Sequence, residues 1–336
     1  MSGLLSLALE FIEITDYDLH HFSSQMPGVV QLRNLRGFRI TMDNDASMVA
    51  LLARIRVPHN ARMSFRFRAR PESYWLTPSL GEECIGVLDD FLASNLIGDM
   101  TPFRTVYLST PDYDHDSGLV ALWHNEPASK WPHYLSRYAP MDRKPDLMVS
   151  LSIWAAQATE PLRILCDHLP LSEVHAISVS TPHQVSKSSL WHGVLRRMKE
   201  TRLLHLSMRQ TMGIVYFLRA LSKRSDMCPS LLFPQLERLV LSDVPIFPTL
   251  SPRDRRDYPN QMVFWLRKRV DRGLKVPMLE FKSVLNLTRS DIDEFRGCAE
   301  EIMWDGTGRI ARHGYFEVED QDDIEPYIFL DSSEAT

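Results

Sequence analysis

Glycine is scarce in this 336-residue chain, which contains only 14 glycines. Neither a G-x-G-x-x-G turn nor a G-x-x-x-x-G-K-[ST] loop occurs, so both common glycine-rich phosphate-binding motifs are missing. The nucleophile elbow G-x-S-x-G and the zinc motif H-E-x-x-H are missing as well. We therefore predict a protein that is not an enzyme, with no catalytic residue, no cofactor and no metal site.

Cysteine is scarcer still, with Cys84, Cys166, Cys228 and Cys298 far apart in the sequence. This spacing contains no close pair, which argues against a zinc site or a redox pair. The interpretation from the residues is four buried, apolar side chains in a reducing compartment. We therefore expect the protein in the cytoplasm or the nucleus.

Long hydrophobic runs and excess positive charge are also lacking. No apolar run reaches the roughly 18 residues that a membrane-spanning helix requires. Glu10 and Glu13 interrupt the first apolar stretch, where a signal peptide would stay apolar. The formal net charge of -5 disfavours general nucleic-acid binding. We expect a soluble protein with no membrane and no nucleic-acid partner.

The main positive feature is a recurring apolar triplet of the form L-x-x-L-x-L. Its last three positions alternate as in a half-buried strand. The seven triplets are Leu35-Phe38-Ile40, Phe103-Val106-Leu108, Val174-Ile177-Val179, Leu203-Leu206-Met208, Leu236-Leu239-Leu241, Val276-Leu279-Phe281 and Ala299-Ile302-Trp304. Further alternating segments start at Leu5, Met63 and Val149.

Between these segments the apolar spacing changes from two to about 3.6, which predicts helices. The helical segments run from Met48 to Ile55, Cys84 to Phe91, Leu190 to Met198, Ile214 to Leu221 and Met262 to Val270. Strand and helix therefore alternate along the chain. In the second half the strands begin roughly 23 to 40 residues apart, near the range of leucine-rich repeats.

This alternation predicts an α/β fold. We favour an irregular leucine-rich-repeat-like solenoid, with parallel strands on the concave face and helices on the convex face. A doubly wound α/β domain is the alternative, but it usually carries a glycine-rich turn that this chain lacks. The predicted solenoid spans 1–306 and contains an irregular insertion at about 110–145. Within this region 119–124 reads as a strand that pairs antiparallel with 147–154. The acidic tail, 307–336, is either disordered or a C-terminal cap that docks through 327–330.

Two stretches carry a family resemblance. The segment Phe233-Pro234-Gln235-Leu236-Glu237-Arg238-Leu239-Val240-Leu241 resembles the F-P-x-L-x-x-L-x-L repeats of fungal F-box proteins. The segment from Leu279 to Gly306, which ends in Trp304-Asp305-Gly306, resembles their closing repeat. The chain is thus similar to the degenerate leucine-rich-repeat region of basidiomycete-type F-box proteins.

The resemblance implies substrate recognition for a Skp-cullin-F-box ubiquitin ligase. No F-box, a helical stretch that typically opens with Leu-Pro, is evident, so binding to the Skp adaptor lacks its usual sequence element. The chain also lacks the Asn or Cys that regular repeats place three positions after the last Leu. Those positions hold Asp43, Pro111, Pro182, Thr211, Val244, Val284 and Thr307. Because the usual Asn ladder is missing, the turns must satisfy their backbone groups in another way.

Three polar groupings are interpreted as ordinary structural features: a solvated loop, histidines at the surface or bonded to backbone in the core, and a solvated helix face. Asp112, Asp114 and Asp116 alternate as in a calcium loop, but Ser117 and Trp123 stand where an EF-hand requires Gly and Glu. The histidine groupings, His20 with His21 and His115 with His124, match no ligand motif. The basic residues Arg267, Lys268, Arg269, Arg272 and Lys275, with Arg253, Arg255 and Arg256 nearby in sequence, are interpreted as a solvated helix face.

The candidate functional surface is the concave face of the predicted sheet, where alternate strand positions are expected to be exposed. Reversing the charge of Arg66 or Arg238 is expected to weaken partner binding and to leave the fold intact. The set predicted to bind a protein partner is mixed and mildly basic: Arg39, Arg66, Arg68, Arg104, Ser178, His205, Arg238 and Lys282.

The function predicted from the sequence is therefore a non-catalytic protein-binding module. Two alternatives remain open: an α/β enzyme with an unrecognised active site, and a truncated paralogue without a function of its own. A convergent set of polar residues in one deep pocket favours the enzyme, whereas an open sheet face favours the binding module.

Overall fold

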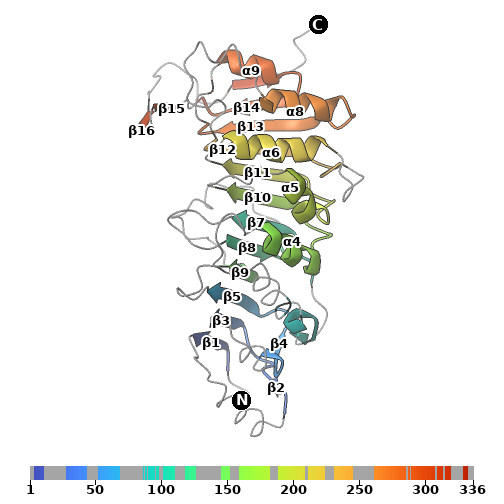
Figure 1. The fold of residues 1–336 in the computed structure, drawn as a ribbon, viewed down its shortest axis with the longest axis vertical. Helices are drawn as coiled ribbons and strands as arrows, with labels where there is room; N and C mark the ends of the chain where they lie inside the picture. The colour runs from blue at the N-terminus through green and yellow to red at the C-terminus, as the bar shows by residue number, and fades with distance from the viewer. Residues whose placement is uncertain are drawn as a thin grey trace. The chain divides into compact units, whose positions relative to one another are not determined.

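The structure is a computed structural model, and the account below covers the residues that it describes. These are 4–10, 28–43, 52–68, 86, 88, 90–94, 96–97, 101–109, 118–125, 145–151, 159–181, 188–208, 211–223, 231–244, 261–284, 287, 289–306, 309–312, 315–318 and 328–331. The chain is an α/β protein that forms two compact units, 1–171 and 172–336, and each has a mostly parallel sheet (Figure 1).

The first unit contains mainly strands. Its elements are β1 (Ser6–Glu10), β2 (Val30–Gln31), β3 (Gly37–Asp43), β4 (Ile55–Pro58), β5 (Arg62–Arg68), β6 (Leu96–Ile97), β7 (Thr105–Ser109), β8 (Gly118–Trp123), β9 (Leu147–Leu151) and α4 (Thr159–His168).

The strand order in this unit is β1-β3-β5-β9-β8-β7, and β2, β4 and β6 form a separate parallel sheet. The pairs β1–β3, β3–β5 and β5–β9 are parallel. Strand β8 is antiparallel to both neighbours, β7 and β9. The antiparallel pairing expected between 119–124 and the strand that starts near Leu147 is therefore confirmed.

Aromatic side chains form the centre of the core in the first unit. Phe38 of β3 stacks on Phe91, with ring centroids 5.6 Å apart, and Phe65 of β5 meets both rings edge-on at 5.9 and 5.4 Å. All three side chains are buried, and Phe91 belongs to a helical stretch, 90–94. The helical spacing predicted for Leu88 and Phe91 is thus confirmed, and it directs both residues to the sheet.

One helix was predicted to extend too far. The period from Met48 to Ile55 predicted a helix ending at Ile55, but Ile55 begins β4. Leu52 is helical, and both Leu52 and Ile55 are buried. Because Ile55 and Val57 are β-branched and both point into the core, the segment satisfies strand spacing equally well. The helical spacing and the strand spacing coincide at Ile55, so the pattern alone places the boundary wrongly.

The second unit alternates strands and helices. Its elements are β10 (Ala176–Thr181), α5 (Ser188–Leu195), β11 (Leu203–Met208), α6 (Thr211–Ser222), β12 (Arg238–Ser242), α8 (Gln261–Val270), β13 (Val276–Lys282), α9 (Arg289–Phe295), β14 (Ala299–Trp304), β15 (Arg309–Arg312), β16 (Tyr315–Val318) and β17 (Ile328–Asp331).

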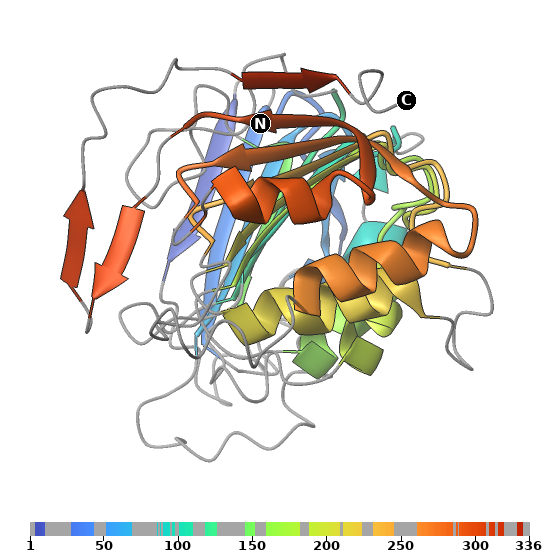
Figure 2. The same cartoon turned by 90° about the horizontal axis from the view of Figure 1, so that it is seen from above.

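Strands β10 to β14 lie side by side in sequence order, and all four pairings are parallel. Strand β17 then pairs antiparallel with β14, while β15 and β16 form a separate antiparallel pair. Helices α5, α6 and α8 lie together on one face of these strands, as the view from above shows (Figure 2). The apolar strands predicted for this region are thus confirmed as β10 to β14.

The core of the second unit lies between this sheet face and the helices. Alternate strand residues such as Leu204, Leu239 and Leu279 are almost fully buried. Helix α5 packs on α6 through Trp191 and Phe217, whose ring centroids are 4.8 Å apart. Phe281 of β13 meets Phe295 of α9 edge-on at 5.0 Å. Each helix therefore covers the sheet with the apolar residues that its 3.6-residue period aligns.

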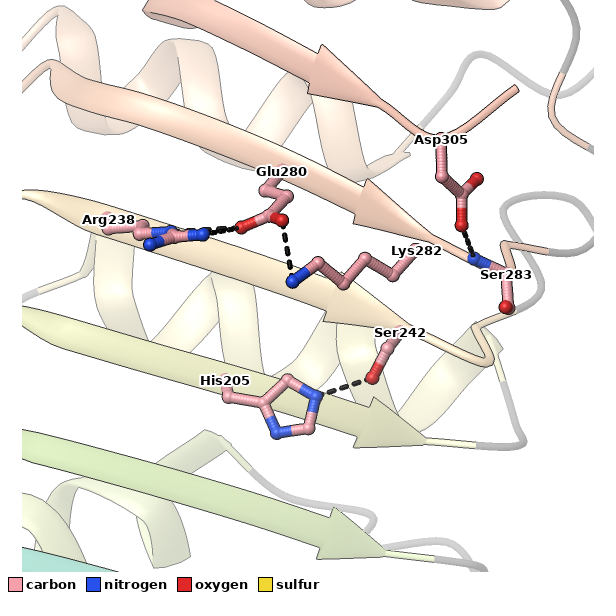
Figure 3. Close-up of polar contacts among 7 residues, drawn as sticks. All are labelled: His205, Arg238, Ser242, Glu280, Lys282, Ser283 and Asp305. Carbon is pink, nitrogen blue, oxygen red and sulfur yellow. Dashed lines mark hydrogen bonds and ion pairs between the residues drawn. The ribbon is translucent and has the colours of Figure 1, made fainter. Parts of the chain in front are cut away.

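The turns after β12 and β13 satisfy their backbone N–H groups without an asparagine side chain. Asp243 and Ser283 adopt left-handed backbone conformations, with φ of 54° and 48°. The Asp243 N–H donates to the Lys282 carbonyl at 3.1 Å, and the Ser283 N–H donates to the Asp305 carboxylate at 2.7 Å (Figure 3). Each turn thus bonds to the next strand or to the residue that follows it, so its backbone N–H has a partner.

Arg269 corrects the interpretation of the basic residues around α8. It was assigned to a solvated helix face, but only 2% of its surface is exposed. Its guanidinium donates to the carbonyls of Leu221, Leu232 and Phe233 at 3.0, 2.8 and 2.5 Å. Burial lowers the pKa of Arg269 to about 10, so the side chain remains protonated at neutral pH. Lys268 and Arg267 on the same helix are exposed, as predicted.

The cysteine prediction holds where it can be compared. Cys166 and Cys298 are buried thiols that form no disulfide. Burial raises the pKa of the Cys298 thiol to about 11, although nearby Arg267 and Lys275 lower it. The Cys298 thiol donates to the Val263 carbonyl at 3.8 Å. Cys298 therefore behaves as a small apolar core residue.

Several predicted features lie outside the described residues. They are Cys84, Cys228, His20, His21, Asp112, Asp114, Asp116, His115, Arg253, Arg255 and Arg256. The predicted insertion and the acidic tail are described only in part. Within the described part of the chain, no helix is long and apolar enough to cross a membrane.

Candidate functional site

The candidate site in the second unit is the sheet face that points away from the helices. Because side chains alternate along a strand, Ser178, His205, Val240, Glu280 and Met303 share this face. The parallel register places these five residues in one row across β10 to β14. The row holds both predicted site residues and residues that sequence reasoning did not select.

His205 links three strands in this row. Its Nδ1 lies 2.8 Å from the Ser178 hydroxyl of β10, and its Nε2 contacts the Ser242 hydroxyl of β12. Figure 3 shows the second of these contacts. Since both ring nitrogens have hydroxyl partners, the imidazole holds β10, β11 and β12 together on this face.

A charged cluster continues the row on β12 and β13. The Glu280 carboxylate accepts a hydrogen bond from Nε of Arg238 at 2.9 Å and lies 2.7 Å from Nζ of Lys282. The Glu280 side chain is only 6% exposed, whereas that of Arg238 is 38% exposed. One buried acid thus contacts two cations (Figure 3), and Arg238 remains partly exposed.

Burial along this row corrects part of the predicted surface. Ser178 and His205 were expected to be exposed, but they are 1% and 4% exposed. Alternation identified the correct sheet face for both residues, but parity along a strand does not determine how much solvent reaches the face. Arg238 and Lys282 occupy the same face and are half-buried.

The predicted arginines of the first unit have different surroundings. Arg39 of β3 and Arg66 of β5 are exposed, as predicted. Arg68 ends β5 in register with Asp43, and its side chain lies outside the described residues. Arg104 is half-buried and precedes β7 instead of lying on a strand, with its N–H donating to the Trp123 carbonyl at 2.8 Å.

Sequence reasoning missed several residues of these faces, among them the polar residues Arg62, Ser64, Ser242 and Glu280. Arg62 and Ser64 precede Arg66 at alternate positions on β5, and Glu280 precedes Lys282 in the same way on β13. Extending the alternation by one or two steps would have found Arg62, Ser64 and Glu280. Ser242 required the register between β11 and β12, which the sequence does not supply.

The described residues on the two sheet faces can interact with a ligand through ion pairs and hydrogen bonds. Among them, no three His, Cys, Asp or Glu side chains are close enough together to hold a metal ion. The partly exposed guanidinium of Arg238 and the exposed ones of Arg39 and Arg66 offer planar donors, which suit carboxylate or phosphate groups.

The fold and these two faces define the chain as an α/β protein with a largely parallel sheet and a polar sheet face in each unit. No protein-family model matches the chain. No curated protein shows significant similarity to it either.

Proposed function

We propose that this chain is a non-catalytic protein-binding module built as an irregular leucine-rich-repeat-like solenoid. The observation that carries the proposal is the strand order of the second unit, in which five parallel strands follow one another in sequence. In a doubly wound domain the strand order reverses at a switch point, and helices cover both faces. Here α5, α6 and α8 lie together on one face of the strands (Figure 2), which supports the proposed solenoid over a doubly wound domain.

The opposite sheet face is the proposed binding surface. Helices bury one side of each strand, and on the other side Arg238, Met278, Lys282 and Met303 are partly exposed, whereas Ser178, His205 and Glu280 are buried. In the second unit this face combines the charged cluster of Arg238, Glu280 and Lys282 with half-buried Met278 and Met303. Arginine and methionine are enriched at protein interfaces, which supports a protein ligand.

The resemblance to fungal F-box proteins supplies the cellular role that we propose. The chain would recognise substrates for a Skp-cullin-F-box ubiquitin ligase, in the cytoplasm or the nucleus. The buried thiols of Cys166 and Cys298, which form no disulfide, suit a reducing compartment of that kind.

Site-specific crosslinking in cell extract tests the proposed function. A photo-crosslinking amino acid replaces Met278 on the sheet face, and in a matched control it replaces exposed Lys268 on α8. We expect a discrete set of proteins crosslinked from position 278 and absent from position 268, scored by mass spectrometry with the Skp adaptor and cullin included. Equal sets from both positions, or no crosslinked protein from either, reject the binding module.

The identity of the crosslinked proteins tests the ligase role separately. Skp and cullin peptides among them support substrate recognition within the ligase. A partner without Skp or cullin leaves a protein-binding module and removes the ligase role. If neither position yields a crosslinked protein, the paralogue without independent function becomes the better account.

A further inference from the structure

Three arginines surround one serine on the open sheet face of the first unit. Arg62 and Arg66 lie two residues before and two residues after Ser64 on β5, so all three side chains share one face. The parallel register places Arg39 of β3 directly opposite Ser64. The three arginines are exposed and Ser64 is half-buried, so three guanidinium groups frame one hydroxyl.

The charges of this triad are not neutralised by the described residues around it. Within the described part of the chain, neither Arg39, Arg62 nor Arg66 forms an ion pair with a carboxylate. By register, Glu10 and Asp43 end β1 and β3, and Asp146, one residue before β9, lies opposite Arg62, where its Oδ2 accepts a hydrogen bond from the His124 N–H at 2.9 Å.

The second unit shows how the same protein compensates cations that belong to its fold. There Glu280 lies between Arg238 and Lys282 and contacts both of them. Like charges on neighbouring strands destabilise a sheet, so an array without a counter-charge has a cost for folding. An anion supplied from outside the chain removes that repulsion, which makes the triad a candidate ligand site.

We propose that Arg39, Arg62 and Arg66, together with the Ser64 hydroxyl, bind an acidic peptide segment of a partner protein. The proposal rests on the proposed protein-binding function and names the chemistry of the partner. Arginine presents a planar fork of donors that matches a carboxylate. Alternate residues of β5 are about 6.6 Å apart, which is also the spacing of alternate residues in an extended peptide. A segment with acids at every second position therefore matches Arg62 and Arg66.

Two observations favour an acidic peptide over a nucleic acid. Binding of single-stranded nucleic acid relies on exposed aromatic rings that stack on bases. Tyr107 and Trp123 share the sheet face of Ser64 by register, but both are 8% exposed and cannot offer a ring face. The net charge of -5 also opposes binding to a polyanion outside this local site.

Fluorescence anisotropy with a labelled 12-residue peptide of alternating Glu and Ser tests the site on the full chain. We expect binding that weakens as salt rises and that is absent for the matching Gln-Ser peptide. The triple variant Arg39→Gln, Arg62→Gln, Arg66→Gln should bind the acidic peptide about tenfold more weakly. The control triple variant Arg33→Gln, Arg197→Gln, Arg289→Gln removes three exposed arginines elsewhere, so it loses the same formal charge and should keep its affinity.

Thermal unfolding provides the second measurement. The triad variant should unfold at the wild-type temperature or above it, because it loses repulsion and no described ion pair. Equal peptide affinities of the two triple variants overturn the site. Tighter binding of a 12-nucleotide oligothymidine through the same arginines overturns the peptide assignment. Crosslinking of a partner from Met278 without any acidic-peptide binding removes the arginine site and leaves the protein-binding function standing.

Discussion

The guanidinium of Arg269 donates a hydrogen bond of 3.0 Å to the carbonyl of Leu221, next to the last residue of α6. A carbonyl at the end of a helix has no partner within the helix, so Arg269 of α8 caps the helix that precedes it. The same guanidinium also bonds the carbonyls of Leu232 and Phe233 in the turn that leads to β12. The buried Arg269 side chain thus connects α8 to the end of α6 and to the turn before β12 by hydrogen bonds.

Replacing Arg269 is expected to destabilise the second unit strongly. The variant Arg269→Met keeps the length of the side chain but leaves three buried carbonyls without a donor, which costs about 3 kcal/mol or more. Urea unfolding followed by circular dichroism measures the loss. The control Lys268→Met, on the exposed side of the same helix, should change stability by less than about 0.5 kcal/mol. Equal effects of the two substitutions would show that the Arg269 contacts are unimportant.

Charge reversal is expected to destabilise the protein at Arg238, which belongs to the charged cluster, and to have little effect at the exposed Arg66. Arg238→Glu places a second carboxylate beside the buried Glu280 and removes its 2.9 Å hydrogen bond, so we expect a loss of about 2 kcal/mol. Arg66→Glu alters an exposed residue and should change stability by less than about 0.5 kcal/mol. From the sequence, both reversals were expected to leave the fold intact. With the contacts of Arg238 known, we now expect this for Arg66→Glu only. Chemical denaturation of both variants decides the matter, and an unchanged midpoint for Arg238→Glu would contradict the cluster's role.

The turn after β13 predicts a difference between two substitutions at Asp305. Asp305→Ala removes the acceptor of the Ser283 N–H, which sits in a left-handed turn, and should cost about 1.5 kcal/mol. Asp305→Asn keeps an oxygen at the same position and should recover about half of that loss. Thermal unfolding of both variants against the wild type measures the difference. Identical losses for Ala and Asn would mean that the hydrogen bond to the turn contributes nothing.

His192 predicts a loss of stability in mild acid. Its side chain in α5 is 2% exposed, its Nδ1 has no hydrogen-bond partner among the described residues, and burial lowers its pKa below the usual 6.5. The folded state therefore resists protonation, and the unfolded chain binds the proton first. Stability is complete above about pH 6.5 and falls as the pH drops toward the lowered pKa of the folded state. Urea midpoints at pH 7.5 and 5.5 should differ more for the wild type than for His192→Phe, and equal differences would contradict this.

Much of the fold follows from the sequence because strand alternation and helix period are local signals. The triplets ending at Val179, Met208, Leu241, Phe281 and Trp304 each mark a strand of the second unit. Register and burial are not local, which explains the errors at His205 and Arg269. A basic residue on a helix is normally solvated. Arg269 is buried because three carbonyl groups from segments distant in sequence accept its hydrogen bonds, and the sequence does not show those contacts.

The candidate site was predictable in part for the same reason. Parity along β3 and β5 identified the exposed Arg39 and Arg66, but the triad around Ser64 depends on the register between the two strands. Left-handed turns at Asp243 and Ser283 were also hidden, because glycine usually signals such turns and neither position holds one.

Hydroxyl-radical footprinting of the chain, free and in complex with a crosslink-identified partner, tests the central claim most directly. Met278 and Met303 report on the open sheet face, and Phe264, which is 48% exposed on α8, reports on the helical side. We expect oxidation of Met278 and Met303 to fall several-fold in the complex while that of Phe264 stays constant. Protection of Phe264 with unchanged oxidation of the two methionines would place the partner on the helices and contradict the proposed binding face.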